Sequence, residues 1–146
     1  MRRIIFFAFF LCSYGAYAGG KGQWTTHPAE DVTYRFYVDT GEKDRWDSSK
    51  QEEPPLAPGK AARVAKEFVT KVPMWRGMKE WSLRKITLEQ LSPAPNEEWV
   101  YIIQFGGVLS ELATWDGHLP LIDIPVRMDG TIPKPLIQGS REVLTK

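Results

Sequence analysis

The sequence has very few of the side chains from which disulfides, metal sites and cysteine nucleophiles are built. It contains one cysteine, Cys12, and two histidines, His27 and His118, among 146 residues. A single cysteine cannot form a disulfide within the chain, and a structural zinc site usually needs four cysteine or histidine ligands. We therefore predict no metal site, no bound cofactor and a fold held together by an ordinary hydrophobic core.

The chain also lacks an excess of charge of either sign. Its 19 basic and 18 acidic side chains give a formal net charge of +1. Proteins that bind nucleic acids or anionic membrane surfaces usually carry a clear basic excess. We therefore expect no nucleic-acid partner.

Motifs for catalysis are absent as well. The sequence has no Gly-x-Ser-x-Gly element for a serine nucleophile, and Gly19-Gly20-Lys21-Gly22 lacks the Gly-Lys-Ser/Thr ending of a phosphate-binding loop. Ser110 or Ser140 would form a Ser-His-Asp set with His118 and Asp123 on paper, but no motif supports it. We predict no catalytic residue, and a small secreted hydrolase with an unrecognised site remains an alternative.

Long apolar runs are missing everywhere except at the N-terminus. Arg2 and Arg3 precede an unbroken apolar run at residues 4–11, and the small residues Ala16 and Ala18 follow it. A positive end, an apolar stretch and two small residues are the three parts of a secretory signal peptide. The pattern predicts cleavage after Ala18, and its bacterial type predicts a periplasmic or secreted protein.

Two other interpretations fit the N-terminal residues less well. A membrane anchor needs about 20 apolar residues, whereas polar or small residues at 13–15 interrupt this run. Lipidation of Cys12 calls for small residues just before it, where Phe10 and Leu11 stand. Removing residues 1–18 from 146 leaves 128, a single domain by length, with no membrane span expected after cleavage.

The remaining chain divides by composition into an arm, a domain and a tail. Residues 19–31 are glycine-rich and polar, which predicts a flexible arm. A single α+β domain is expected at 32–138, interrupted by a long polar loop at 40–59 that contains three prolines. Residues 139–146 are expected to form a polar tail.

Hydrophobic periodicity predicts the elements of the domain. Apolar residues at helical spacing from Lys60 to Val72 predict an amphipathic helix, which Pro73 ends. Residues that alternate between apolar and polar predict strands at 32–39, 82–91, 99–105 and 119–128. A change of phase between Leu83 and Ile86 predicts a bulge.

Three further features complete the expected sheet. The strand at 99–105 has apolar residues on both faces, so both faces should be covered, and Gly106-Gly107 should end it in a glycine bulge. Asp129-Gly130 predicts a tight hairpin that returns through Thr131-Ile132. We therefore expect an α+β fold, in which one amphipathic helix packs on a curved antiparallel sheet of about four to five strands.

A helix followed by three or four strands resembles the cystatin fold and the small exported bacterial modules of the PepSY type. Residues 126–132, Val-Arg-Met-Asp-Gly-Thr-Ile, are similar to the closing hairpin of those modules. The resemblance covers about residues 58–137 and lies in the order of the elements. The segment Gln104-Phe105-Gly106-Gly107-Val108 departs from the Gln-x-Val-x-Gly pattern of the cystatin inhibitory loop, so no inhibitory residue is carried over.

Tryptophan is the residue type that stands out, with six in the chain. Several lie in segments expected to be an arm, a loop or a turn, where an indole either covers an edge of the core or takes part in recognition. Covering the core is the simpler explanation, because a chain of this size without disulfides needs that burial. The candidate binding residues are Trp46, Trp75, Trp115 and His118.

These observations favour an exported, non-catalytic module that binds a protein or peptide. Binding would use a sheet edge or the loops that carry Trp75 and Trp115. The alternative is a carbohydrate- or cell-envelope-binding domain, in which loop tryptophans stack on the sugar rings of an envelope glycan.

Overall fold

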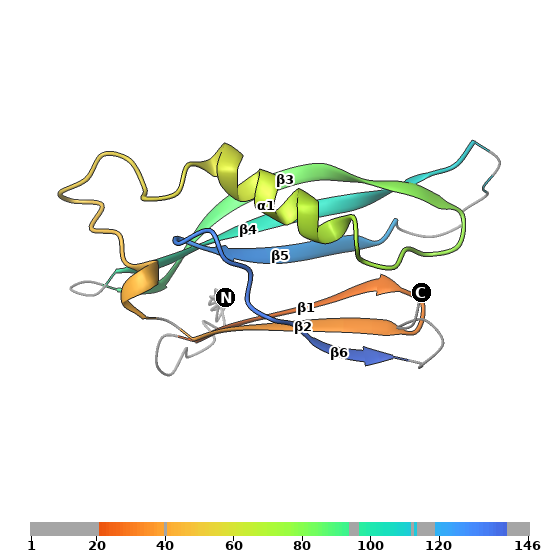
Figure 1. The fold of residues 1–146 in the computed structure, drawn as a ribbon, viewed down its shortest axis with the longest axis horizontal. Helices are drawn as coiled ribbons and strands as arrows, with labels where there is room; N and C mark the ends of the chain where they lie inside the picture. Colours follow the sequence, from red (N-terminus) through yellow and green to blue (C-terminus); the bar gives the residue numbers. More distant parts are fainter. Residues whose placement is uncertain (1–20, 40, 94–96, 112, 114–118, 140–146) are drawn as a thin grey trace, which may run out of the picture.

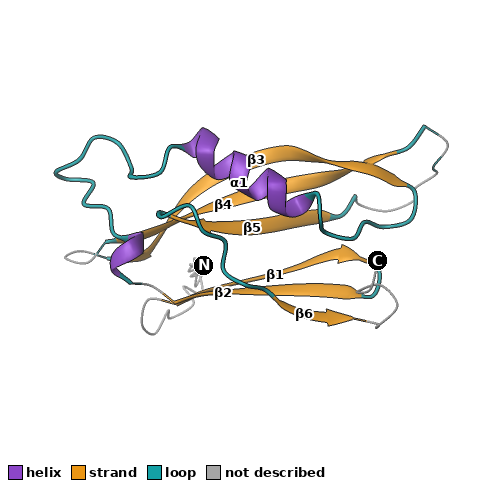
Figure 2. Ribbon diagram, in the orientation of Figure 1, coloured by secondary structure: helices purple, strands orange, loops and turns teal. Residues whose placement is uncertain are grey.

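The computed structural model describes residues 21–39, 41–93, 97–111, 113 and 119–139. Within these ranges the chain forms six strands, one α-helix and one turn of 3-10 helix, η1 (Glu42–Asp44). The strands form two three-stranded antiparallel sheets (Figure 1, Figure 2). The expected α+β class is confirmed, but the expected single sheet of four to five strands is wrong.

Sheet A consists of β1 (Lys21–Ala29), β2 (Val32–Asp39) and β6 (Leu136–Gly139), in the order β1-β2-β6. The prediction of a flexible arm at 19–31 is therefore wrong for most of that segment, because β1 pairs with β2 from Lys21 opposite Asp39 to Thr26 opposite Tyr34. The ladder between β1 and β2 provides hydrogen-bond partners for the backbone N–H and C=O groups of this segment. Its polar composition therefore does not prevent it from forming a strand.

Sheet B consists of β3 (Met78–Ser92), β4 (Glu98–Leu109) and β5 (Leu121–Arg127), in the order β3-β4-β5. The predicted bulge is present, as a register shift between Leu83 and Lys85 opposite β4. The predicted glycine bulge is not, because β4 continues through Gly106 and Gly107 to Leu109.

The α-helix of the described residues, α1 (Pro58–Val69), lies across one face of sheet B (Figure 1). Pro58 occupies the first turn, where its missing amide hydrogen costs nothing. Ala61, Ala65 and Val69 are buried, as their spacing on one side of the helix predicts. Phe68 reaches sheet A, where its ring centroid lies 5.8 Å from that of Phe36.

The chain crosses from sheet B to sheet A after β5, so the predicted closing hairpin is wrong. The turn itself forms as expected, with Gly130 at a φ of 81°. Pro133 and Pro135 have no amide hydrogen to donate to β5, and the chain continues until β6 pairs with β2.

The sheets meet where β1 lies beside β5, without forming a ladder between them. The Thr26 hydroxyl donates to the Leu121 carbonyl at 2.9 Å. Pro28 in β1 and Pro125 in β5 cannot donate amide hydrogen bonds, which limits pairing between these two strands. This accounts for two sheets where the sequence pattern suggested one.

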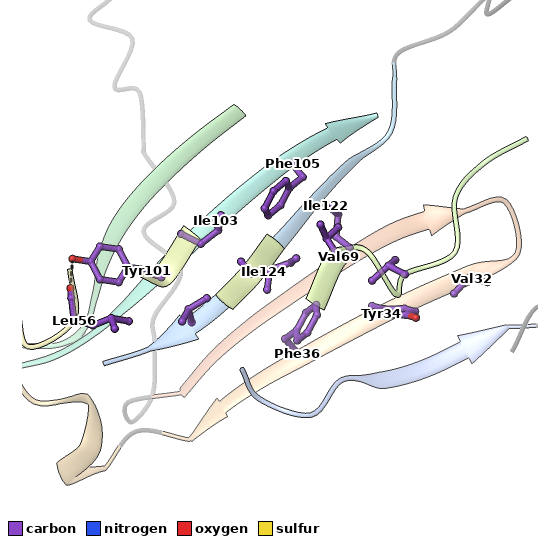
Figure 3. Packing of buried hydrophobic residues seen from close by; sticks show 14 of the residues in the cluster. Val32, Tyr34, Phe36, Leu56, Val69, Tyr101, Ile103, Phe105, Ile122 and Ile124 are labelled. Atoms are coloured by element: carbon purple, nitrogen blue, oxygen red, sulfur yellow. Dashed lines mark hydrogen bonds between the residues drawn. The ribbon is translucent and has the colours of Figure 1, made fainter. Parts of the chain in front are cut away.

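Most of the core lies between α1 and the sheets (Figure 3). Tyr101, Ile103 and Phe105 of β4 contribute to this core, and the Tyr101 hydroxyl donates to the Leu56 carbonyl at 2.9 Å. On the opposite face of β4, Val100 and Ile102 pack with Val38. Both faces of β4 are therefore covered, as predicted.

Candidate binding cleft

Trp46 folds back onto the start of β4. Its ring centroid lies 5.3 Å from that of Trp99, and the Trp99 indole N–H donates to the Trp46 carbonyl at 3.1 Å. The Trp46 amide donates to the Glu97 carbonyl at 3.1 Å. Trp46 therefore helps to hold the polar loop against sheet B.

Trp75 lies near the other end of β4. Its indole N–H donates to the His27 carbonyl at 3.2 Å, which ties the segment after α1 to β1. The Trp75 carbonyl accepts from the amide of Met78, which pairs with Leu109, the last residue of β4.

The candidate binding residues therefore do not gather into one site. Trp46 and Trp75 lie near opposite ends of the 12-residue β4, which spans roughly 35 Å. Trp115 and His118 lie outside the described residues, as do Ala16 and Ala18 of the expected cleavage site.

A cleft opens between β1 of sheet A and β3 of sheet B. It has a volume of about 270 Å³ and is lined by Gly22 and Trp24 from β1 and by Glu89, Gln90 and Leu91 from β3. Pockets for drug-sized ligands usually measure about 300–1,000 Å³. The cleft is therefore closer in size to one long side chain than to a whole small-molecule ligand.

Trp24 forms the aromatic wall of this cleft. Gly22 and Trp24 point to the same face of β1 because they are two positions apart, and the indole ring lies over Gly22. A Cβ atom at position 22 would lie 2.1 Å from the indole atom Cη2, so only glycine leaves room for the ring. Trp24 also contacts both buried clusters, which fixes its position.

Glu89 supplies the charge on the opposite wall. Burial raises the pKa of its carboxyl above the ordinary 4.5, the negative charge of Asp123 raises it further, and Lys85 lowers it. Gln104 donates a side-chain hydrogen bond to Asp123 at 2.9 Å. The indole of Trp24 and the carboxylate of Glu89 thus line the same cleft, and burial and the charge of Asp123 destabilise the negative charge of this carboxylate.

Neither Trp24 nor Glu89 is among the candidate binding residues that the sequence suggested. The alternation of Lys21, Gln23 and Thr25 with Gly22, Trp24 and Thr26 is a strand signal. It is obscured by the glycines at the start of the segment. No local pattern connects this segment with Glu89, since the two come together only through the packing of the sheets.

Two further cavities flank α1, each of about 250 Å³. One is lined by Trp81 and Glu80 of β3 and by Lys66 of α1, among others. The other is mainly apolar and has Lys71 and Lys134 at its sides. The cleft at Trp24 is distinguished as a candidate site by Glu89, whose carboxyl has a pKa raised by burial.

Within the part of the chain that the structure describes, no three histidine, cysteine or acidic residues are grouped so as to hold a metal ion. In the same ranges, no helix is both long enough and apolar enough to cross a membrane. Comparison of the chain with protein-family models, with curated proteins and with solved structures finds no match.

Proposed function

We propose that this protein is an exported, non-catalytic binding module that takes a cationic side chain of a protein partner into the cleft between β1 and β3. The observation that carries the proposal is that the indole of Trp24 and the carboxylate of Glu89 line the same cavity. Lysine and arginine side chains combine an apolar stem with a cationic end, which suits one aromatic wall and one acidic wall.

The electrostatics of the cleft favour a cation over a neutral ligand. A cation over an indole face gains about 0.5–1 kcal/mol at an exposed site and about 2 kcal/mol when desolvated. An ammonium or guanidinium group would also offset the burial of the Glu89 charge and its repulsion from Asp123, both of which raise the pKa of Glu89. A lone lysine side chain should therefore bind weakly, and tight binding of a partner would need further contacts outside the cleft.

The test is a titration of the purified protein with Nα-acetyl-lysine amide, followed by NMR through the indole N–H resonance of Trp24. The resonance is assigned from the Trp24→Phe variant. We expect saturable shifts with a dissociation constant of about 1–10 mM, and at least a several-fold weaker response to Nα-acetyl-norleucine amide, which keeps the apolar stem without the charge.

Variants of β3 supply the matched controls. Glu89→Gln should abolish the preference for lysine over norleucine, whereas Glu80→Gln removes the same charge from an exposed position on the same strand and should leave it intact. Equal binding of the two amides would contradict the proposal. A response to the neutral sugar chitobiose that survives Glu89→Gln would favour the glycan-binding alternative instead.

Export is part of the same proposal and rests on the N-terminal pattern of Arg2, Arg3, the apolar run and Ala16-x-Ala18. When the full chain is expressed in a bacterium, the processed protein should collect outside the cytoplasm with Gly19 as its first residue. N-terminal sequencing of the fractionated protein measures this. An unprocessed chain in the cytoplasm would contradict it.

A further inference from the structure

β3 forms the outer edge of sheet B. It is 15 residues long, and no other strand of the described ranges pairs with the side facing away from β4. Exposed strand edges are usually protected by charged side chains and bulges, and β3 has register shifts at Leu83/Lys85 and at Gln90/Ser92. Between these shifts, the stretch from Lys85 to Gln90 pairs regularly with β4 and leaves a regular edge.

A second copy of the chain can extend this edge only in particular registers. A two-fold axis perpendicular to the sheet would pair β3 with β3 of the other copy in antiparallel orientation. Residues opposite each other in such a pair lie on the same face of the sheet, and side chains alternate between faces. The axis must therefore pass midway between the two copies of one residue, which then lie opposite each other. It cannot pass at a point between two neighbouring positions of the strand.

The register centred on Thr87 places opposite charges face to face. Lys85 of each copy lies opposite Glu89 of the other, so the register forms two equivalent charge pairs. On the other face, Ile86, which is 37% exposed in the single chain, lies opposite Leu88. Directly opposed side chains of opposite charge, and directly opposed apolar side chains, favour the pairing of antiparallel strands.

Other two-fold registers in the regular stretch lack these charge pairs. Centring on Lys85 or on Glu89 places identical charges opposite each other. Centring on Ile86 pairs Lys85 with Thr87, centring on Leu88 pairs Glu89 with Thr87, and centring on Gln90 pairs Glu89 with Leu91. Among the two-fold registers of this stretch, the charges of Lys85 and Glu89 therefore favour the one centred on Thr87.

We infer that the protein forms a two-fold symmetric dimer in which the β3 edges pair around Thr87 and join two copies of sheet B into one continuous sheet. This goes beyond the proposed function by naming a second partner, and the two proposals share Glu89, which lines the cleft and lies opposite Lys85 of the other copy in this register. Lys85 does not line the cleft, so variants of Lys85 test the dimer separately. The partner is a second copy of this chain, identified by the match between Lys85 and Glu89.

Charge reversal tests this dimer, with sedimentation velocity as the measurement. The unaltered protein should dimerise reversibly over the micromolar to millimolar range. Lys85→Glu or Glu89→Lys alone places like charges opposite each other twice, and each should weaken dimerisation roughly tenfold or more. Lys79→Glu makes the same charge change on β3 outside the paired stretch and should leave dimerisation unaltered.

Two combinations of these variants test whether the dimer uses the register centred on Thr87. An equimolar mixture of the two single variants should form a heterodimer, since acidic residues on one chain then face lysines on the other. The double variant Lys85→Glu/Glu89→Lys should dimerise with itself again. A monomeric unaltered protein at millimolar concentration would overturn the inference, and so would single variants that still dimerise or a mixture that stays monomeric.

Discussion

At the scale of single residues, the negative charge of Glu89 lowers the stability of the folded protein, and a role in binding explains why an acidic residue stands at this position. Its carboxyl has a raised pKa because of burial and the charge of Asp123. A carboxyl whose pKa is higher in the folded than in the unfolded state favours folding less as pH rises through the folded pKa. Glu89 therefore weakens the fold at neutral pH, while its charge serves the cleft.

Replacing Glu89 with glutamine should thus stabilise the protein near neutral pH. We expect a gain of about 0.5 kcal/mol or less at about pH 7, since solvent screens this partly exposed side chain, and no gain at about pH 3, where Glu89 is protonated in both states. Urea unfolding at the two pH values measures the difference. A loss of stability at neutral pH would show that Glu89 serves the fold and not the cleft.

Asp44, unlike Glu89, is an acidic residue whose negative charge is paired inside the folded protein. It is fully buried, and the Arg127 guanidinium donates hydrogen bonds to it and to the Asp39 carbonyl, the latter at 2.8 Å. The pair ties η1 to the end of β5. The hydrogen bonds that the Arg127 guanidinium donates to the Asp44 carboxylate hold the pKa of Arg127 above its ordinary value.

Asp44→Asn should destabilise the protein by about 3 kcal/mol, because it leaves the Arg127 charge without its partner. Chemical denaturation measures this change. Asp47→Asn is the comparison: Asp47 pairs with Lys50 at 2.7 Å on the surface, and its loss should leave stability almost unaltered. Similar effects of the two substitutions would contradict a structural role for the buried pair.

At the scale of the elements, the pattern of apolar and polar residues predicted those features that depend only on neighbouring residues in the chain. The apolar stripe of α1, the bulge in β3 and the two covered faces of β4 are properties of consecutive residues, and the structure has all three. The segment of β1 and the destination of β6 were predicted wrongly. The destination of β6 depends on pairing with β2, which lies more than 90 positions away in the chain. β1 pairs with β2 directly after it, and it was missed because the glycines at its start obscure the alternation of its residues.

Gly22 provides a test of how β1 builds the cleft. A methyl group at position 22 would overlap the Trp24 ring, so Gly22→Ala should displace the indole and abolish the response to Nα-acetyl-lysine amide. Gly59→Ala is the matched control, because position 59 lies in α1 with no atom within 4 Å of an added Cβ. It should leave binding intact and stabilise the fold by about 0.5–1 kcal/mol. Unaltered binding by Gly22→Ala would show that Trp24 does not form the wall of the site.

At the scale of the whole molecule, the candidate site exists because two sheets form instead of one. Gly22 and Trp24 belong to sheet A, whereas Glu89, Gln90 and Leu91 belong to sheet B. A single sheet of the kind expected from the sequence would leave these segments apart. The tryptophans that the sequence emphasised, Trp46 and Trp75, make hydrogen bonds or ring contacts that tie loops to strands.

The most direct measurement of the central claim is the position of a bound lysine side chain. In the NMR spectra of the protein with Nα-acetyl-lysine amide, we predict nuclear Overhauser effects between the ligand's ε-methylene protons and the indole ring protons of Trp24. Effects to Trp46, Trp75 or Trp115 in place of Trp24 would contradict the account.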